Sequence, residues 1–139
     1  MRAKAPFPLA RSLDGTVEDI MTTGVVSLPA TAPLRSVHEA IVAHDVHAVL
    51  IVEPSDGHPC GWITTHGLLA WAGNVGSHRN ARSAINEPVR TVAPGSSIRE
   101  AAEVMVAAGV SHVLVAEREG AAPLGVVADG DIVRLESLH

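Results

Sequence analysis

The sequence predicts an α+β fold that contains two copies of one β-α-β-β-α unit. The first observation is that the chain matches itself without gaps when it is shifted by 64 residues. The second is that short β-branched runs alternate with segments whose apolar residues recur at helical spacing. The third is size, because one copy is too small to bury both faces of its sheet. We therefore expect the copies to pack with pseudo-two-fold symmetry, their sheets facing each other.

The self-match extends across most of the chain in a single register. Identical pairs include Val25/Val89, Arg35/Arg99, Glu39/Glu103, Val49/Val113, Leu50/Leu114, Glu53/Glu117 and Pro59/Pro123. A single register favours internal duplication over chance similarity between two apolar-rich segments. We expect a tail over residues 1–15, the first copy over 16–72, a polar, glycine-rich linker over 73–82 and the second copy over 83–136.

Composition and charge argue against several classes of protein. The net charge of −5 disfavours an electrostatic nucleic-acid surface. No apolar run approaches the roughly 20 residues that a membrane helix needs, and Pro6 and Pro8 interrupt the segment where a signal peptide would be apolar. Cys60 is the single cysteine, which excludes a disulfide framework. We expect a protein without membrane or nucleic-acid partners in a reducing, cytoplasmic location.

The elements of the first copy carry local sequence signals. Thr16 can cap a short helix, Pro29 confines its strand to an edge or an end, and Pro33 suits the first turn of a helix. A near-continuous β-branched run favours a strand that is buried on both faces. The expected elements are a helix over 16–21, an extended stretch over 25–28, a helix from 33 to about 43, a buried strand over 46–52, a return strand over 60–63 and a helix over 65–72.

The second copy repeats this order. Ser97 and Glu100 have the spacing of a capping box, and Gly109 is placed to end the same helix. The expected elements are an extended stretch over 89–92, a helix over 98–108, a buried strand over 110–116, a return strand over 125–128 and a helix over 129–137.

Each copy has the same kind of junction between its last strand and its last helix. Residues 61–67 read Gly-Trp-Ile-Thr-Thr-His-Gly, and residues 125–131 read Gly-Val-Val-Ala-Asp-Gly-Asp. A glycine and two apolar residues are followed by small or polar residues and then by an apolar run. This pattern predicts a buried strand that turns directly into a helix. The amides at such a helix start can hold an anion.

The order of elements, the repeat and the junction together resemble the cystathionine-β-synthase (CBS) domain, of which two in tandem form a CBS pair or Bateman module. The stretch Val-Glu-Asp-Ile-Met-Thr over residues 17–22 is similar to the family's opening, and the junction is similar to its glycine–apolar–x–Thr/Ser–x–x–Asp motif. The resemblance covers residues 16–136. It implies a regulatory module that binds AMP, ADP, ATP or S-adenosylmethionine in clefts between the repeats and forms a homodimer.

The resemblance also implies roles for the junction residues, and each junction departs from the motif. The family's aspartate holds the ribose hydroxyls, and its Thr/Ser with the helix amides holds phosphate. Thr64 is present in the first junction, but Gly67 stands where the family has aspartate. Asp131 is present in the second, but Ala128 stands where the family has Thr/Ser. A carboxylate can accept both hydrogen bonds of a ribose diol, so the Asp131 cleft is the better ribose site, and its helix amides remain candidates for phosphate.

The resemblance places further residues beside each cleft. The Asp131 cleft would be lined by Val127, Ala128, His112, Thr31, Val46 and His47, and the Thr64 cleft by Trp62, Ile63, Val110 and Ser111. Structural alternatives stay open for several of these residues. Asp131 and Thr64 also suit the start of a helix, and His47 and His112 are also compatible with packed strand residues.

The sequence offers no metal site and no catalytic site. The eight histidines are His38, His44, His47, His58, His66, His78, His112 and His139. Zinc needs close ligands at defined spacing, and the expected switch from helix to strand separates His44 from His47. No nucleophile elbow, P-loop or dinucleotide fingerprint is present.

Two functions remain open, and a third, a small enzyme, would need a reactive pair of residues that the sequence does not offer. The favoured one is a stand-alone regulatory CBS pair, not an enzyme and without a required cofactor, that binds an adenosyl ligand and signals to a regulated protein. The alternative is a structural dimerisation module whose sites are degenerate and ligand-free. The divided motif, with Thr64 in one junction and Asp131 in the other, keeps this alternative open.

Overall fold

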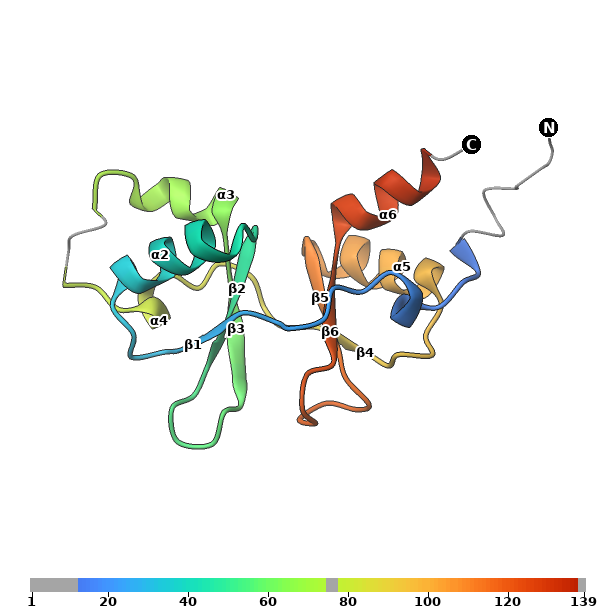
Figure 1. Cartoon of the computed structure of the whole chain (residues 1–139), viewed down its shortest axis with the longest axis horizontal. Helices are drawn as coiled ribbons and strands as arrows, with labels where there is room; N and C mark the ends of the chain where they lie inside the picture. Colours follow the sequence, from blue (N-terminus) through green and yellow to red (C-terminus); the bar gives the residue numbers. More distant parts are fainter. Residues whose placement is uncertain (1–12, 75–77, 138–139) are drawn as a thin grey trace. The chain divides into compact units, whose positions relative to one another are not determined.

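The computed structural model describes residues 13–74 and 78–137, and the chain divides into two compact units (Figure 1). Residues Val25–Val89 form one unit, which we call the central unit. The described residues up to Gly24 and those from Arg90 onward form the other, which we call the split unit.

The central unit contains a three-stranded sheet in the order β1-β2-β3. Strand β1 is parallel to β2, and β2 is antiparallel to β3. The elements are β1 (Ser27–Pro29), α2 (Leu34–His44), β2 (Ala48–Val52), β3 (Pro59–Thr64), α3 (Thr65–Leu68), the 3-10 helix η2 (Leu69–Trp71) and α4 (Ala81–Ala84). Pro29 is the last residue of an edge strand, as expected, because it cannot donate to a ladder.

Helix α2 packs its apolar stripe against this sheet. Leu34 and Val37 are fully buried and form one core cluster with Val49, Ile51 and Ile63. Val49 and Ile51 are alternate residues of β2, so one face of the strand supplies both. The helix ends where Asp45 takes a left-handed conformation, with φ of 52°.

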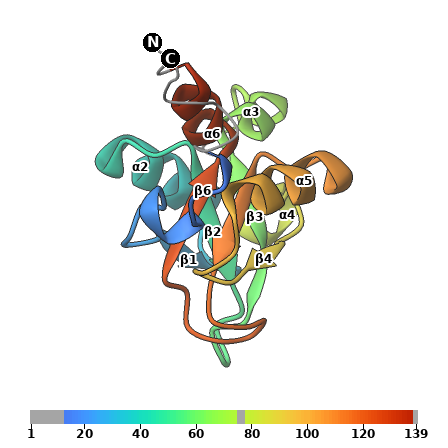
Figure 2. The same ribbon diagram turned by 90° about the vertical axis from the view of Figure 1, so that its right-hand side faces the viewer.

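The split unit has the same topology, with sheet order β4-β5-β6. Strand β4 is parallel to β5, and β5 is antiparallel to β6. Its elements are the 3-10 helix η1 (Val17–Asp19), β4 (Thr91–Val92), α5 (Ile98–Ala108), β5 (His112–Val115), β6 (Gly125–Ala128) and α6 (Asp129–Glu136). Helix α5 covers one face of strands β5 and β6 in both views (Figures 1 and 2).

The capping signals of α5 are confirmed. The Glu100 amide donates to Ser97 Oγ at 3.0 Å, and the Ser97 amide donates to Glu100 Oε1 at 3.3 Å. Gly109 ends the helix with φ of 66°. These local contacts fix both ends of α5 at the expected residues. Strand β6 is also confirmed at both ends, whereas β2 and β5 are each shorter than the apolar runs that contain them.

The short segment before the first strand of each copy, which we call the lead-in segment, packs with the strands of the other copy. Val17, in the first lead-in, is fully buried in the core of the split unit, and its amide donates to Ser96 O at 2.9 Å. Thr22 exchanges two backbone hydrogen bonds with Val126 of β6. Chain order predicts that residues 16–21 belong to the first copy, and no local signal in the sequence indicates this exchange.

The second lead-in belongs to the central unit in the same way. It contains α4, whose Ala81 and Ala84 are buried in the central core. The Asn86 amide donates to Trp62 O at 3.0 Å, and the Trp62 amide donates to Glu87 O at 2.9 Å. Helix α4 begins inside the stretch expected as loop, because Asn80 caps it through the Ser83 amide.

The α+β class and the two repeats are confirmed, and the packing of one repeat on the other stays a prediction. In residues 13–74 and 78–137, no helix combines the length and the apolar character needed to cross a membrane.

The close approach of the first lead-in to β6 gives a test of the exchange. A Cβ on Gly125 would lie 2.7 Å from Met21 Sδ and 2.8 Å from the Thr22 carbonyl oxygen. Since the carbonyl belongs to the backbone, we expect Gly125→Ala to lower the free energy of unfolding by about 1–3 kcal/mol, measured by urea denaturation. Gly95→Ala is the control, because a Cβ there meets nothing within 4 Å. Equal effects of the two substitutions would contradict the placement of the lead-in.

Candidate functional site

The junction of the split unit brings together four of the residues singled out from the sequence. His112 lies opposite Ala128 in the β5–β6 ladder, and the Asp129 amide donates to Ser111 O at 2.8 Å. The Ser111 hydroxyl lies 2.9 Å from His112 Nδ1. Asp131 follows in the first turn of α6. Strand pairing and one backbone bond therefore assemble this cluster.

The Asp131 carboxylate has one structural contact and one weak contact. Its Oδ2 accepts from the Ala128 amide at 2.9 Å, which confirms the helix-capping interpretation. Its Oδ1 accepts from Arg134 Nη2 at 2.9 Å, and the Arg134 side chain is 75% exposed. An exposed ion pair of this kind contributes little stability. The arginine can therefore release Oδ1 to a ligand while Oδ2 keeps the carboxylate in place.

The start of α6 is poorly suited to a phosphate. The amides of Ala128, Asp129 and Gly130 already donate to Asp131 Oδ2, Ser111 O and Asp129 Oδ1. Two carboxylates, Asp129 and Asp131, lie in the first turn, where they compensate the helix dipole and repel an anion. The geometry favours ligand hydroxyl groups at Asp131 over phosphate at the helix start.

The junction of the central unit has the same backbone and different side chains. The Thr65 amide donates to His47 O at 2.9 Å, as Asp129 does to Ser111 one repeat later. Thr64 Oγ1 accepts from the Gly67 amide at 3.0 Å, which confirms Thr64 as a helix cap. Asn86 Nδ2 also donates to Thr64 Oγ1, at 2.9 Å. Asn86 was missed by the sequence analysis.

The remaining candidates are divided between the two units. Ile63 and Val127 are fully buried members of the central and split cores respectively, and Val110 also lies in the split core. In the central unit Thr31 and His47 are exposed, Val46 is half-buried and Trp62 is buried. The ligand-binding roles that the family resemblance implies for these residues stay predictions.

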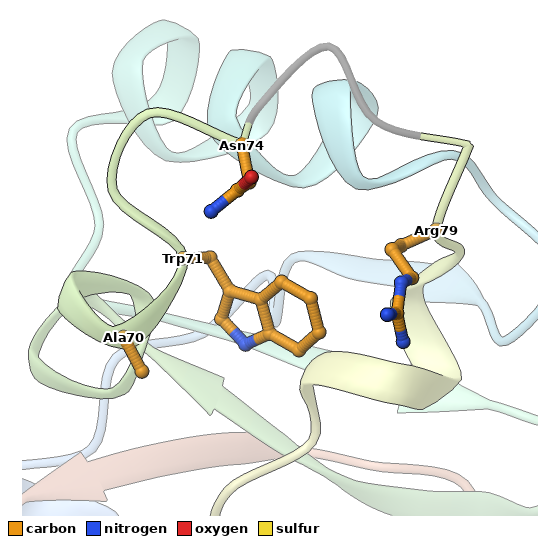
Figure 3. Close-up of a pocket in the computed structure, with 4 residues that line it drawn as sticks. All are labelled: Ala70, Trp71, Asn74 and Arg79. Atoms are coloured by element: carbon orange, nitrogen blue, oxygen red, sulfur yellow. The ribbon is translucent and has the colours of Figure 1, made fainter.

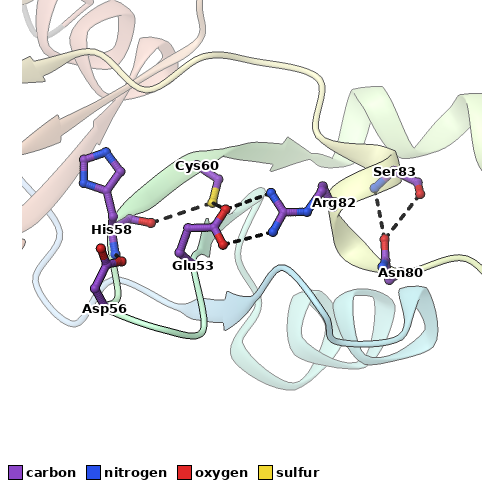
Figure 4. A network of polar contacts seen from close by, with 7 residues as sticks. All are labelled: Glu53, Asp56, His58, Cys60, Asn80, Arg82 and Ser83. Atoms are coloured by element: carbon purple, nitrogen blue, oxygen red, sulfur yellow. Dashed lines mark hydrogen bonds and ion pairs between the residues drawn. The ribbon is translucent and has the colours of Figure 1, made fainter.

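A second polar cluster ties α4 to the end of β2 (Figure 4). Arg82 donates to both carboxylate oxygens of Glu53, at 2.8 and 3.0 Å, and Cys60 Sγ donates to Glu53 Oε1 at 3.3 Å. The Arg82 hydrogen bond lowers the pKa of Glu53. Burial, together with the neighbouring Glu53 carboxylate, raises the pKa of the Cys60 thiol. A thiol held protonated in this way is a poor nucleophile, so the cluster is best explained as a structural contact.

The central unit also has a shallow pocket of about 300 Å³, lined by Ala70, Trp71, Asn74 and Arg79 (Figure 3). The Arg79 guanidinium carbon lies 5.5 Å from the centroid of the Trp71 ring. This cation–π contact covers a face of the indole, which a ligand would otherwise stack on. The volume is at the lower limit for ligand pockets. The spacing of these four residues in the sequence does not predict that they line one pocket.

Within residues 13–74 and 78–137, no group of three or more His, Cys, Asp or Glu side chains is placed to hold a metal ion.

Comparisons with known proteins agree with the duplicated topology. The family model described as the CBS domain matches residues 17–74 and again residues 81–137. A search of curated proteins finds no match.

Solved structures share the fold at low sequence identity. One is the CBS domain of a membrane protein from Sphaerobacter thermophilus, with 22% identity, a TM-score of 0.73 and coverage of 91% of each chain. Another is the CBS domain of a bacterial CNNM/CorC family Mg²⁺ transporter in complex with ATP, with 18% identity and a TM-score of 0.76. The match covers 93% of this chain and 94% of that one.

Helix α3 has a side-chain cap and α6 has none, so opposite substitutions at the two cap positions should have opposite effects on stability. Thr64 and Ala128 have nearly the same backbone conformation, with φ and ψ of −97° and 157° and of −99° and 156°. We expect Thr64→Ala to lower the free energy of unfolding by about 1–3 kcal/mol, because it removes both the side-chain cap and the acceptor of Asn86 Nδ2. We expect Ala128→Ser to raise it by about 0.5–1 kcal/mol, because α6 has no side-chain cap. Urea denaturation measures both, and a loss of stability in Ala128→Ser would contradict the comparison.

Proposed function

This chain belongs to the CBS domain family, and we propose that it is a regulatory CBS pair that binds an adenosyl ligand through Asp131 and signals to a partner protein. The observation that carries the proposal is the arrangement of the Asp131 carboxylate. One oxygen is fixed by a backbone amide, and the other is held by an exposed arginine. A ribose offers two hydroxyl donors to such an acceptor. The structural relative in complex with ATP supports this ligand class.

The charge of the site favours some adenosyl ligands over others. Asp129 and Asp131 lie together in the first turn of α6, and the neighbouring amides already have acceptors. Each added phosphate would therefore bring negative charge towards two carboxylates. We expect S-adenosylmethionine and AMP to bind more tightly than ADP and ATP. Ser111 and His112 lie beside the junction and are the groups that would contact the rest of the ligand.

The proposed mechanism is a shift in population between conformations. A ligand changes the conformation of a protein only through its different affinity for the available states. A partner protein would then read the state that the ligand stabilises. No chemical step on the ligand is required, so the proposed role is not enzymatic. Cys60 is the single cysteine of the sequence, which is compatible with the proposed cytoplasmic location.

The proposed oligomer is a homodimer formed through exposed apolar side chains that recur in both copies. Val42 on α2 is 81% exposed and Val106 on α5 is 83% exposed, and they are equivalent at the shift of 64 residues. Leu69 and Val133 are likewise equivalent, at 68% and 63% exposure. Single exposed apolar residues are common, but a matched set in both repeats favours a common interface.

The alternative function is a structural dimerisation module without a physiological ligand. The observation that favours it is the internal hydrogen bonding at both junctions, where Thr64 Oγ1 and the amides of Thr64, Thr65, Ala128 and Asp129 already have protein partners. This alternative expects a stable dimer that no adenosyl compound stabilises.

Ligand binding is tested by thermal unfolding with AMP, ADP, ATP and S-adenosylmethionine. A ligand at about 100 times its dissociation constant adds about 2.7 kcal/mol of stability. We expect Asp131→Asn to weaken binding of the best ligand about 10- to 100-fold, because it removes the charge and one of the two acceptors. Asparagine keeps an acceptor for the Ala128 amide, so the fold should persist.

Asp129→Asn is the matched control, because Asp129 bonds the Gly130 amide and lies beside Asp131. Titrated with adenosine as a fifth compound, which has no phosphate, Asp131→Asn should lose affinity and Asp129→Asn should not. Stabilisation by none of the four compounds would favour the dimerisation alternative. Equal losses of affinity in both variants would show that general charge, and not the Asp131 position, attracts the ligand.

Dimer formation is tested by light scattering coupled to size-exclusion chromatography. We expect Val42→Glu and Val106→Glu each to convert the dimer to a monomer, because each buries a charge in the interface. Leu124→Glu is the control, since Leu124 is a 37% exposed apolar residue whose equivalent, Cys60, is half-buried against the central core. A dimer that survives both valine substitutions would place the interface elsewhere.

A further inference from the structure

We propose that the Asn86 side chain permanently occupies the Thr64 junction and excludes an adenosyl ligand from it, so that each chain holds one such ligand, at Asp131. The first part of this inference depends on the geometry of the central unit alone. The second part rests on the proposed function.

The backbone of the second lead-in segment fixes the position of Asn86. Its amide donates to Trp62 O at 3.0 Å, and the Trp62 amide donates to Glu87 O at 2.9 Å. These bonds pair the residue with β3, two positions before Thr64. The Asn86 side chain then reaches the point where β3 turns into α3.

At that point the carboxamide makes two hydrogen bonds to the same residue. The Thr64 amide donates to Asn86 Oδ1 at 2.9 Å, and Asn86 Nδ2 donates to Thr64 Oγ1 at 2.9 Å. Thr64 Oγ1 also accepts from the Gly67 amide, so both of its acceptor positions are filled. The amides of Thr64, Thr65 and Gly67 all have acceptors inside the central unit. A ligand could bind the Thr64 amide, or replace the Nδ2 donor on Thr64 Oγ1, only after it displaced Asn86.

The carboxamide also fills the space of the missing aspartate. A Cβ built on Gly67 has its three nearest neighbours in Asn86, namely Cγ, Nδ2 and Oδ1, all closer than real Cβ contacts allow. Any side chain at position 67 would therefore have to push the carboxamide off Thr64. Gly67 and Asn86 are thus explained together. The Asn86 carboxamide lies where an aspartate side chain at position 67 would lie, so an internal hydrogen-bonding group replaces a ligand-binding one.

The second copy has the opposite combination. The residue equivalent to Asn86 at the shift of 64 is Thr22, whose amide likewise donates to the carbonyl of the equivalent strand residue, Val126. The return bond differs, because the Val126 amide donates to Thr22 O, whereas the Trp62 amide donates to Glu87 O. A threonine has no carboxamide to donate and accept at once, and Ala128 has no hydroxyl to receive a donor. The same internal clamp cannot form there. Asp131 is present in this copy, where the clamp is absent.

A double-mutant cycle tests the occupancy without any ligand. We expect Gly67→Ala to lower the urea midpoint of the otherwise unchanged chain, because the methyl group displaces the carboxamide. In an Asn86→Ala background, the same substitution should leave the midpoint unchanged or raise it, because alanine favours helix over glycine. Thr22→Ala is the matched control background, in which Gly67→Ala should remain destabilising. An equal loss in all backgrounds would overturn the occupancy.

Titration calorimetry of the full chain tests the exclusion, with S-adenosylmethionine and AMP as the probes. We expect one molecule per unchanged chain and two per chain that carries both Gly67→Asp and Asn86→Ala. Two per unchanged chain, or one per doubly substituted chain, would overturn the exclusion. If neither probe binds any variant, the proposed function and the one-ligand statement fail together. The unfolding cycle then still decides whether Asn86 occupies the junction.

Discussion

Both sheets depend on a strand position without a side chain. Gly61 and Gly125 begin the buried parts of β3 and β6, and a Cβ at either would meet the lead-in segment that lies against it. Because the Cβ is absent, Ile85 packs over Gly61 and Met21 packs over Gly125. The contact holds each lead-in beside the last strand of its unit. The exchange of lead-in segments, the burial of Val17 and the position of Asn86 therefore all depend on this packing over a glycine.

The two junctions show how a duplicated backbone can acquire different chemistry. In both, the first amide of the helix donates to a carbonyl before the middle strand of the sheet, from Thr65 to His47 and from Asp129 to Ser111. The scaffold is the same, so the difference lies in side chains alone. One junction joins a threonine to an internal carboxamide, and the other leaves a carboxylate with a single fixed oxygen. Changes at three equivalent positions are enough to separate a structural site from a candidate binding site.

The sequence predicts the elements whose ends are set by local signals. It does not predict the contacts that depend on pairing between distant parts of the chain. Helix α5 was placed to the residue because Ser97 and Gly109 act within one turn of its ends. The exchange of lead-ins was not foreseen, because it is decided by bonds such as Thr22 to Val126, which join distant parts of the chain. Of the site, Asp131 and Thr64 stood out through a motif. Asn86 did not, since an isolated asparagine in a polar stretch has no spacing that indicates its partner.

The exchange of lead-ins also bears on the order of folding during synthesis. The central unit is contiguous, Val25–Val89, so all its residues are synthesised before the part of the split unit that begins at Arg90. The η1 segment emerges first but has to wait for Ser96 and β6 to bury Val17. When they arrive, the loop to be closed contains a folded unit instead of flexible chain, so little entropy remains to be lost in closing it. We therefore expect the central unit to fold first during synthesis and the split unit to be completed afterwards, when the first lead-in pairs with β6.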